Sequence, residues 1–274
     1  MPELPEVETI RRGLEKVLPG RKISKVDVRY SGSIKMPTVS KFTAKLPGRR
    51  VIKIGRRGKY LQIFLDNESV LVIHLRMTGK LIFSFTPLTI DKHTHVIFTF
   101  SDHSVLYFND IRKFGTIYWL PIKRMYEIKG LACLGPEPFS PEFCPGYMAE
   151  KLAKKKTTIK AVLLNQEFVA GLGNIYVDEA LFRAQIHPQR AAASLTQKEM
   201  AALYRAICEV LQEAINCRGT TMSDYRDATG AYGGFQQLLR VYRRSGKACL
   251  VCGYPIERII VAGRGTHYCP NCQK

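Results

Sequence analysis

Residues 249–272 read CLVCGYPIERIIVAGRGTHYCPNC and contain two Cys-x2-Cys pairs separated by sixteen residues. This spacing is typical of four-cysteine zinc sites, in which four thiolates surround the metal tetrahedrally and leave no open coordination position. We therefore expect one structural Zn²⁺, bound by Cys249, Cys252, Cys269 and Cys272.

The residues between the two cysteine pairs predict a β-hairpin. Ile256–Val261 and Thr266–Tyr268 read as strands, joined through residues 262–265. Arg264 stands in that connection between two glycines, which permit a close backbone approach; an ordinary solvated turn arginine is the alternative. His267 could also bind zinc, but four cysteines already suffice, so a packed histidine is favoured.

The residues that precede this hairpin predict helices. Thr157–Gln166 begins with an N-cap at Thr157, a loop holding Gly171 and Gly173 leads into Asn174–Arg183, and Thr196-x-x-Glu199 is a capping box for a helix to about residue 216. The glycine-rich stretch 219–234 has no apolar periodicity, and loops of that length are usually functional or disordered.

The first part of the chain predicts a helix followed by short strands. Residues 5–18 carry apolar side chains at helical spacing, and four prolines within Gly135–Gly146 indicate an interdomain linker. Turn residues separate the strand-like runs, which favours an antiparallel sandwich or barrel. The runs are Lys25–Tyr30, Arg50–Ile54, Tyr60–Leu65, Ser69–His74, Leu81–Phe85, His95–Phe100, Val105–Phe108 and Thr116–Leu120.

The charge balance predicts a polyanionic partner. Forty-two Lys and Arg face 23 Asp and Glu, for a net charge of +19, which suits nucleic acid or an anionic membrane. No run of about 18 apolar residues and no signal-peptide pattern is present, so we expect a cytoplasmic or nucleoid-associated protein. The four remaining cysteines are expected to be free thiols.

The start of the chain, Met1-Pro2-Glu3-Leu4-Pro5-Glu6, combines a potential amine nucleophile with carboxylates. Removal of Met1 would leave Pro2 with a secondary amine, and an α-amino group has a pKa of roughly 7.7–8.0. Such an amine can attack a sugar C1′ and form an iminium that acts as an electron sink. Acidic residues and prolines are also common in an ordinary first helical turn.

Seven motifs in one order resemble those of the bacterial formamidopyrimidine-DNA glycosylase family, which repairs oxidised bases. They are PELPEVETIRR at 2–12, RRGKYL at 56–61, HLRMTG at 74–79, DIRKFGT at 110–116, LGPEP at 134–138, AGLGNIYVDEALF at 170–182 and VAGRGTHYCPNCQ at 261–273. The resemblance implies that Pro2 forms a Schiff base with the damaged nucleotide's sugar. It also implies that Glu3 supplies a proton and Glu6 organises the terminus.

The same resemblance assigns contacts to the DNA backbone. It places Lys59 near the scissile sugar, with a role in β-elimination, and Arg264 with Asn174 on the phosphates that flank the extruded nucleotide. Lys155, within a run of lysines, and His93 are implied DNA contacts. Without the resemblance, Lys59 reads as a surface lysine on a strand edge and the lysine run as a solvated face.

Three further residues are implied in base extrusion, since an enzyme that acts on a stacked base must flip it out. Met77 would fill the vacated space, Phe114 would wedge the opposite strand, and Arg112 would bind the orphaned cytosine. Without the resemblance, Met77 and Phe114 read as core residues. Thr78 stands where some relatives carry an acid, and Arg243 replaces a common glycine.

We therefore expect an α+β protein with three domains. These are an N-terminal helix with an antiparallel β-sandwich (1–134), a helical helix–two-turns–helix domain (135–240) and a zinc hairpin (241–274). It would act as a monomer on double-stranded damaged DNA, as a glycosylase and lyase for 8-oxoguanine and formamidopyrimidines, and bind no membrane. The alternatives are an endonuclease VIII-type glycosylase for oxidised pyrimidines and a non-catalytic zinc DNA-binding module.

Overall fold

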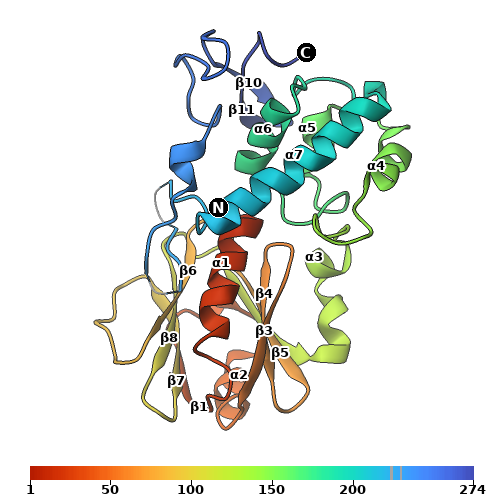
Figure 1. Ribbon diagram of the computed structural model, residues 1–274. Helices are drawn as coiled ribbons and strands as arrows, with labels where there is room; N and C mark the ends of the chain where they lie inside the picture. The colour runs from red at the N-terminus through yellow and green to blue at the C-terminus, as the bar shows by residue number, and fades with distance from the viewer. Residues whose placement is uncertain (223–224, 229) are drawn as a thin grey trace. The chain divides into compact units, whose positions relative to one another are not determined.

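A computed structural model describes residues 1–222, 225–228 and 230–274 of the chain (Figure 1). Two compact units are present. Met1–Ala132 and Cys217–Gly234 form the first unit, and Cys133–Asn216 with Phe235–Lys274 form the second. The three domains expected from the sequence stay a prediction. Ser223, Asp224 and Thr229, which belong to the predicted loop 219–234, lie outside the described residues.

The first unit contains one helix at its start and two sheets. The elements are α1 (Leu4–Glu15), β1 (Ile23–Val28), β2 (Ile34–Met36), α2 (Val39–Lys45), β3 (Val51–Arg57), β4 (Tyr60–Leu65), β5 (Ser69–His74), β6 (Gly79–Ser84), β7 (Thr94–Phe100), β8 (Val105–Asp110), β9 (Thr116–Pro121) and α3 (Lys129–Ala132). One sheet has the order β2-β9-β5-β4-β3 and the other β1-β7-β8-β6. The expected helix and β-sandwich are confirmed.

One hydrophobic core joins α1 to both sheets. Val7, Ile10 and Leu14 of α1, at helical spacing, are each at most 1% exposed and belong to the same buried cluster as residues of β4, β5, β7 and β8. The interior strands β4, β5, β7 and β8 are buried along nearly their whole length, whereas the edge strands β1, β2, β3 and β6 are only partly buried. Burial of these apolar faces supplies the main driving force for the unit.

Two short elements of the first unit were not predicted from the sequence. β2 pairs in parallel with β9, whereas the sequence favoured antiparallel pairing throughout. α2 begins at an N-cap, Thr38, whose side chain accepts a hydrogen bond from the backbone N–H of Lys41. A three-residue strand and a helix of two turns carry too little periodicity to be detected locally.

The second unit is mainly helical and ends in a two-stranded hairpin. Its elements are α4 (Pro145–Leu152), α5 (Ile159–Leu164), α6 (Asn174–Arg183), α7 (Gln197–Asn216), β10 (Glu257–Val261) and β11 (Arg264–Tyr268). Within the described part of the chain, none of the helices has the length and apolar character needed to span a bilayer.

Three local expectations for the second unit need correction. α5 is capped by Thr158, not Thr157, because the Thr158 side chain accepts the backbone N–H of Ala161. Pro145, expected in a linker, occupies the first turn of α4, where its missing N–H costs nothing. Arg264 pairs with Val261 as the first residue of β11, so the turn consists of residues 262–263.

Candidate active site and metal centre

The beginning of α1 holds the three residues proposed for the nucleophile and its carboxylates. Pro2, Glu3 and Glu6 are all buried, and the two carboxylates are 3% and 1% exposed. Glu3 is the N-cap, and a capping box links it to Glu6. The backbone N–H of Glu3 donates to the Glu6 carboxylate at 2.8 Å. This reciprocal arrangement fixes the backbone that immediately follows Pro2.

Glu6 also joins α1 to the segment Cys217–Gly234. The backbone N–H of Thr220 donates to Glu6 Oε1 at 2.7 Å, and the Tyr225 hydroxyl donates to the Glu6 carbonyl oxygen at 3.4 Å. Gly219 has a φ of +81°, and a Cβ placed there would lie 2.8 Å from Glu6 Oε1. Glycine is therefore favoured at 219 both by the backbone conformation and by the nearby carboxylate.

Lys59 lies at the turn between β3 and β4, directly after Gly58 (φ +55°). Lys59 is only 7% exposed, which excludes the alternative of a solvated surface lysine on a strand edge. Burial together with the positive charges of Arg76 and Lys59 lowers the pKa of His74 to about 3. His74 is therefore neutral, and its Nδ1 accepts the backbone N–H of Arg76 at 3.0 Å.

Glu8, two residues after Glu6 in α1, is surrounded by a cluster of arginines. Arg56 Nε donates to Glu8 Oε2 at 3.1 Å, and Arg11 and Arg12 donate to the same carboxylate. Burial alone would raise the pKa of Glu8, but the hydrogen bonds and charges of these arginines outweigh it and lower the pKa. Glu8 is thus a structural anion that ties α1 to β3.

The turns after β5 and β8 present the residues proposed for base extrusion. Met77 and Phe114 are 38% and 52% exposed, which excludes the alternative of core residues. The Arg112 guanidinium lies 4.7 Å from the centroid of the Phe114 ring. Ile111, in the same turn, is a further exposed apolar side chain (48%) that was not singled out from the sequence.

His93 adjoins this region through the backbone. Its N–H donates to the Asp91 carboxylate at 2.6 Å, and its carbonyl oxygen accepts the N–H of Asp110 at 2.9 Å. His95, expected to serve packing, is 3% exposed, and its Nε2 lies 2.7 Å from the Asp110 carbonyl oxygen. The first unit therefore groups His93 with the turn that carries Arg112.

In the second unit, Asn174 and Arg264 lie at neighbouring positions. Asn174 opens α6, and its Nδ2 donates to the carbonyl oxygen of Gly265 at 2.8 Å. Arg264, the preceding residue, is exposed. The Asn174 amide therefore holds the beginning of β11, next to Arg264. Lys155 is also exposed, just before the N-cap of α5, and no described contact joins it to these two residues.

Two buried acids of α6 anchor the hairpin and its lead-in segment. Asp178 Oδ1 accepts Lys160 Nζ at 2.5 Å with both side chains fully buried, and Asp178 Oδ2 accepts the backbone N–H of His267 at 2.9 Å. Glu179 accepts the backbone N–H groups of residues 240–242. In the sequence Lys160 looks like part of the basic run, and only tertiary structure reveals its buried partner.

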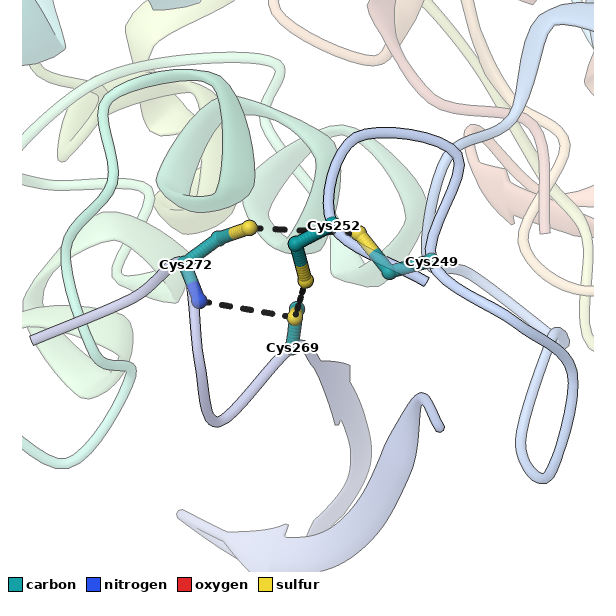
Figure 2. A group of neighbouring side chains, drawn as sticks. All are labelled: Cys249, Cys252, Cys269 and Cys272. Carbon is teal, nitrogen blue, oxygen red and sulfur yellow. Dashed lines mark hydrogen bonds between the residues drawn. The ribbon is translucent and has the colours of Figure 1, made fainter. Parts of the chain in front are cut away.

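The four cysteines of the last 26 residues, Cys249, Cys252, Cys269 and Cys272, converge as expected for a zinc site (Figure 2). Their sulfur atoms all lie within 4.8 Å of one another. Cys249 Sγ lies 3.9 Å from Cys272 Sγ, and Cys252 Sγ lies 3.5 Å from Cys269 Sγ. A tetrahedron with Zn–S bonds of about 2.3 Å has edges of about 3.8 Å, so the sulfurs fit one Zn²⁺. His267 is not part of this group but stacks edge-on against Tyr242.

Three family models match successive parts of the chain, and individual relatives match it over its whole length. Family models match at residues 1–117 (formamidopyrimidine-DNA glycosylase N-terminal domain), 134–226 (formamidopyrimidine-DNA glycosylase H2TH domain) and 246–274 (zinc finger found in FPG and IleRS). The chain belongs to the formamidopyrimidine-DNA glycosylase family. The family's zinc finger coincides with the four converging cysteines, so this member has a site for one structural zinc.

Individual relatives of the formamidopyrimidine-DNA glycosylase family agree over their full length. The formamidopyrimidine-DNA glycosylase of Desulforamulus reducens is 48% identical over 275 residues, which cover 100% of this chain and 99% of the relative. Wild-type Lactococcus lactis Fpg in complex with N7-benzyl-Fapy-dG DNA is 40% identical, with a TM-score of 0.93 and full coverage of both chains. Wild-type Lactococcus lactis Fpg in complex with an oxidised-pyrimidine DNA is 39% identical, with a TM-score of 0.92 and full coverage of both chains.

Proposed function

We propose that this member of the formamidopyrimidine-DNA glycosylase family excises oxidised purines from double-stranded DNA and then cleaves the strand. The observation that carries the proposal is the buried first turn of α1, where Pro2 is followed by the mutually capped carboxylates of Glu3 and Glu6. The relative that was solved with a Fapy-dG derivative supports a formamidopyrimidine substrate. We propose that the protein acts as a monomer in the cytoplasm, on nucleoid DNA.

The reaction begins at Pro2. Met1 converts the Pro2 nitrogen into an amide, which is not nucleophilic, so the mechanism requires that Met1 be removed. The resulting secondary amine bonds to C1′ of the damaged nucleotide, and the glycosidic C1′–N bond breaks with its electrons moving to the base. The proton that the amine loses neutralises the departing base. Glu3 donates a proton to the ring oxygen as the sugar opens, which leaves an iminium between Pro2 and C1′. Glu6 holds the backbone of Glu3 throughout.

The iminium then drives strand cleavage. Its positive charge acidifies the C2′ proton, whose loss expels the 3′-phosphate, and a second elimination expels the 5′-phosphate. Water hydrolyses the remaining iminium and restores the amine. Lys59 and Arg264 assist these eliminations through the phosphates. The zinc supplies no chemistry in these steps; held by Cys249, Cys252, Cys269 and Cys272, it stiffens the hairpin that carries Arg264.

The remaining residues hold and distort the duplex. Asn174, Lys155 and His93 contact phosphates, which fixes register without reading sequence. Met77 and Phe114 enter the base stack, and their exposed apolar side chains suit a wedge that unstacks a base step. Arg112 binds the base that the extruded nucleotide leaves behind. The net charge of +19 supports tight, salt-sensitive binding to the phosphate backbone.

Borohydride trapping tests the nucleophile. Protein that retains Met1 and the same protein after digestion with methionine aminopeptidase, both verified by intact mass, are incubated with an 8-oxoguanine·C duplex and borohydride. We expect a covalent crosslink only after Met1 is removed, and its loss in Pro2→Gly. Equal crosslinking with and without Met1 would assign the nucleophile to a different amine. The absence of a crosslink in both forms would instead support the alternative that the protein is a non-catalytic zinc DNA-binding module.

A preference for oxidised pyrimidines is the second candidate, favoured by the related Lactococcus lactis complex with oxidised-pyrimidine DNA. Competition kinetics between 8-oxoguanine·C and thymine glycol duplexes separate the two. We expect faster excision of 8-oxoguanine, and faster excision of thymine glycol would assign the protein to an endonuclease VIII-type specificity.

A further inference from the structure

The buried carboxylate of Asp110 joins two turns of the first unit that the chain order keeps apart. Asp110 is 1% exposed. Its Oδ1 accepts the Thr78 hydroxyl at 2.5 Å and the backbone N–H of Arg112 at 3.2 Å, and its Oδ2 accepts the backbone N–H of Gly115 at 2.6 Å. One carboxylate thus organises the turn after β8 and reaches across to the turn after β5.

Thr78 closes this connection from the other side. Its hydroxyl oxygen donates its proton to Asp110 and at the same time accepts the backbone N–H of Arg112 at 3.0 Å. The Thr78 hydroxyl can do both because it carries one donor and two acceptor lone pairs. A carboxylate there would repel Asp110, and an aliphatic side chain would form neither bond.

The two turns need such a connection because their backbones are in unfavourable conformations. Arg76 and Lys113 both have a positive φ, of 54° and 59°, a region that costs a non-glycine residue about 1 kcal/mol. The anchor itself is firmly held, since the backbone of Asp110 bonds to His93 and His95. Thr78 therefore links the turn of Met77 to a fixed point beside Arg112 and Phe114.

We propose that Thr78 is a specificity-determining positioning residue, which sets how strictly Arg112 reads the base opposite the lesion. Thr78 acts by fixing the position of the Arg112 backbone relative to the turn of Met77, through its own hydroxyl and through Asp110. This inference rests on the proposed function, in which Arg112 binds the orphaned cytosine. It concerns discrimination between opposite bases, not the excision step.

Single-turnover excision of 8-oxoguanine opposite C and opposite A tests this role. Thr78→Val removes the hydroxyl at nearly constant volume and Thr78→Ser retains it. Thr43→Val is the matched control, because the hydrogen bonds of the Thr43 hydroxyl to the described residues stay within α2. We expect Thr78→Val to lower the C:A rate ratio about fivefold, the size of one hydrogen bond. Thr78→Ser and Thr43→Val should keep the wild-type ratio.

Three results would overturn the proposal: an unchanged ratio in Thr78→Val, an equal fall in Thr43→Val, or a fall in Thr78→Ser as large as in Thr78→Val. If Thr78→Val does not fold, Thr78→Ala removes the same hydroxyl without adding a methyl group and is judged by the same ratio. Failure of the proposed function is distinguishable, because wild-type protein would then excise 8-oxoguanine opposite neither base.

Discussion

Glu6 and Thr220, 214 positions apart in the sequence, are joined by a hydrogen bond of 2.7 Å from the Thr220 backbone N–H to the Glu6 carboxylate. The same carboxylate accepts the N–H of Glu3. The backbone at Thr220 and the backbone beside Pro2 are therefore connected through one buried side chain.

Replacement of Gly219 by alanine should disturb this link specifically. The new Cβ would lie 2.8 Å from Glu6 Oε1, in addition to the strain of a φ of +81°. Gly230→Ala is the matched control, because Gly230 has a φ of +85° and a Cβ placed there would face open space, with no described atom beyond its chain neighbours within 4 Å. We expect a cost of about 1 kcal/mol in stability for the control.

The two alanine variants are compared by thermal unfolding and by the rate of borohydride trapping on 8-oxoguanine·C DNA. Gly219→Ala should lose more stability than Gly230→Ala and should trap DNA about tenfold more slowly, while the control traps at close to the wild-type rate. Equal trapping rates for the two variants would show that the Glu6–Thr220 contact has no part in the reaction.

Loss of one buried cysteine should abolish metal binding. Cys269 is fully buried within the sulfur cluster, whereas Cys133 is exposed and outside it. We expect one zinc per chain in wild type and in Cys133→Ala, and almost none in Cys269→Ala, because three thiolates no longer close the site. Elemental analysis measures the zinc, and a filter-binding assay should show weaker DNA binding. Full zinc content in Cys269→Ala would contradict the assignment.

His74 should make stability depend on pH. Its pKa is about 3 in the folded chain, against 6.5 when exposed, so the unfolded chain binds the proton first as the pH falls. The free energy of unfolding is therefore unaffected by His74 above about pH 6.5. It falls progressively at lower pH, by about 2 kcal/mol at pH 5.

Urea unfolding of wild type and His74→Asn at pH 7 and pH 5 measures this effect. Asparagine can still accept the Arg76 backbone N–H but does not titrate in this range. The decline between pH 7 and pH 5 should be smaller in the variant by about 2 kcal/mol. An identical decline in both proteins would mean that His74 takes up its proton equally in the folded and unfolded chains.

The buried Lys160–Asp178 pair should be sensitive to the loss of either charge. Lys160→Met leaves the Asp178 carboxylate buried without its cation, which costs about 3–5 kcal/mol. Lys160→Met with Asp178→Asn removes both charges and keeps an acceptor for the His267 backbone, so the double variant should be more stable than Lys160→Met alone. Lys156→Met, at an exposed position, is the control. Thermal unfolding by circular dichroism decides; a double variant less stable than the single would contradict this view.

The sequence was sufficient to predict elements that are defined by interactions between residues close together in the chain. The ranges predicted for β4, β5 and α6 agree with the structure, and the capping box at Thr196 and Glu199 does begin α7. In each of these, apolar periodicity or a cap stands within a few residues of the element that it defines. The cysteine spacing likewise contained all four ligands.

Tertiary contacts decided what the sequence could not show. Lys160 looks like any lysine of a basic run until α6 brings Asp178 beside it. Thr78 and Asp110 bond across two turns whose relative placement depends on the pairing of β6 with β8. Arg264 lies in β11 and not at the hairpin tip because register, not composition, fixes the turn length.

The return of residues 217–234 to the first unit has a consequence for how such genes recombine. A crossover anywhere between the codons of Glu6 and Thr220 would give a chimera in which one parent supplies the acceptor and the other the donor. Chimeras of related genes should therefore be tolerated best when both parents have the same backbone conformation at Thr220. A fragment that stops at residue 132 would leave the Glu6 carboxylate without the Thr220 N–H that it binds here.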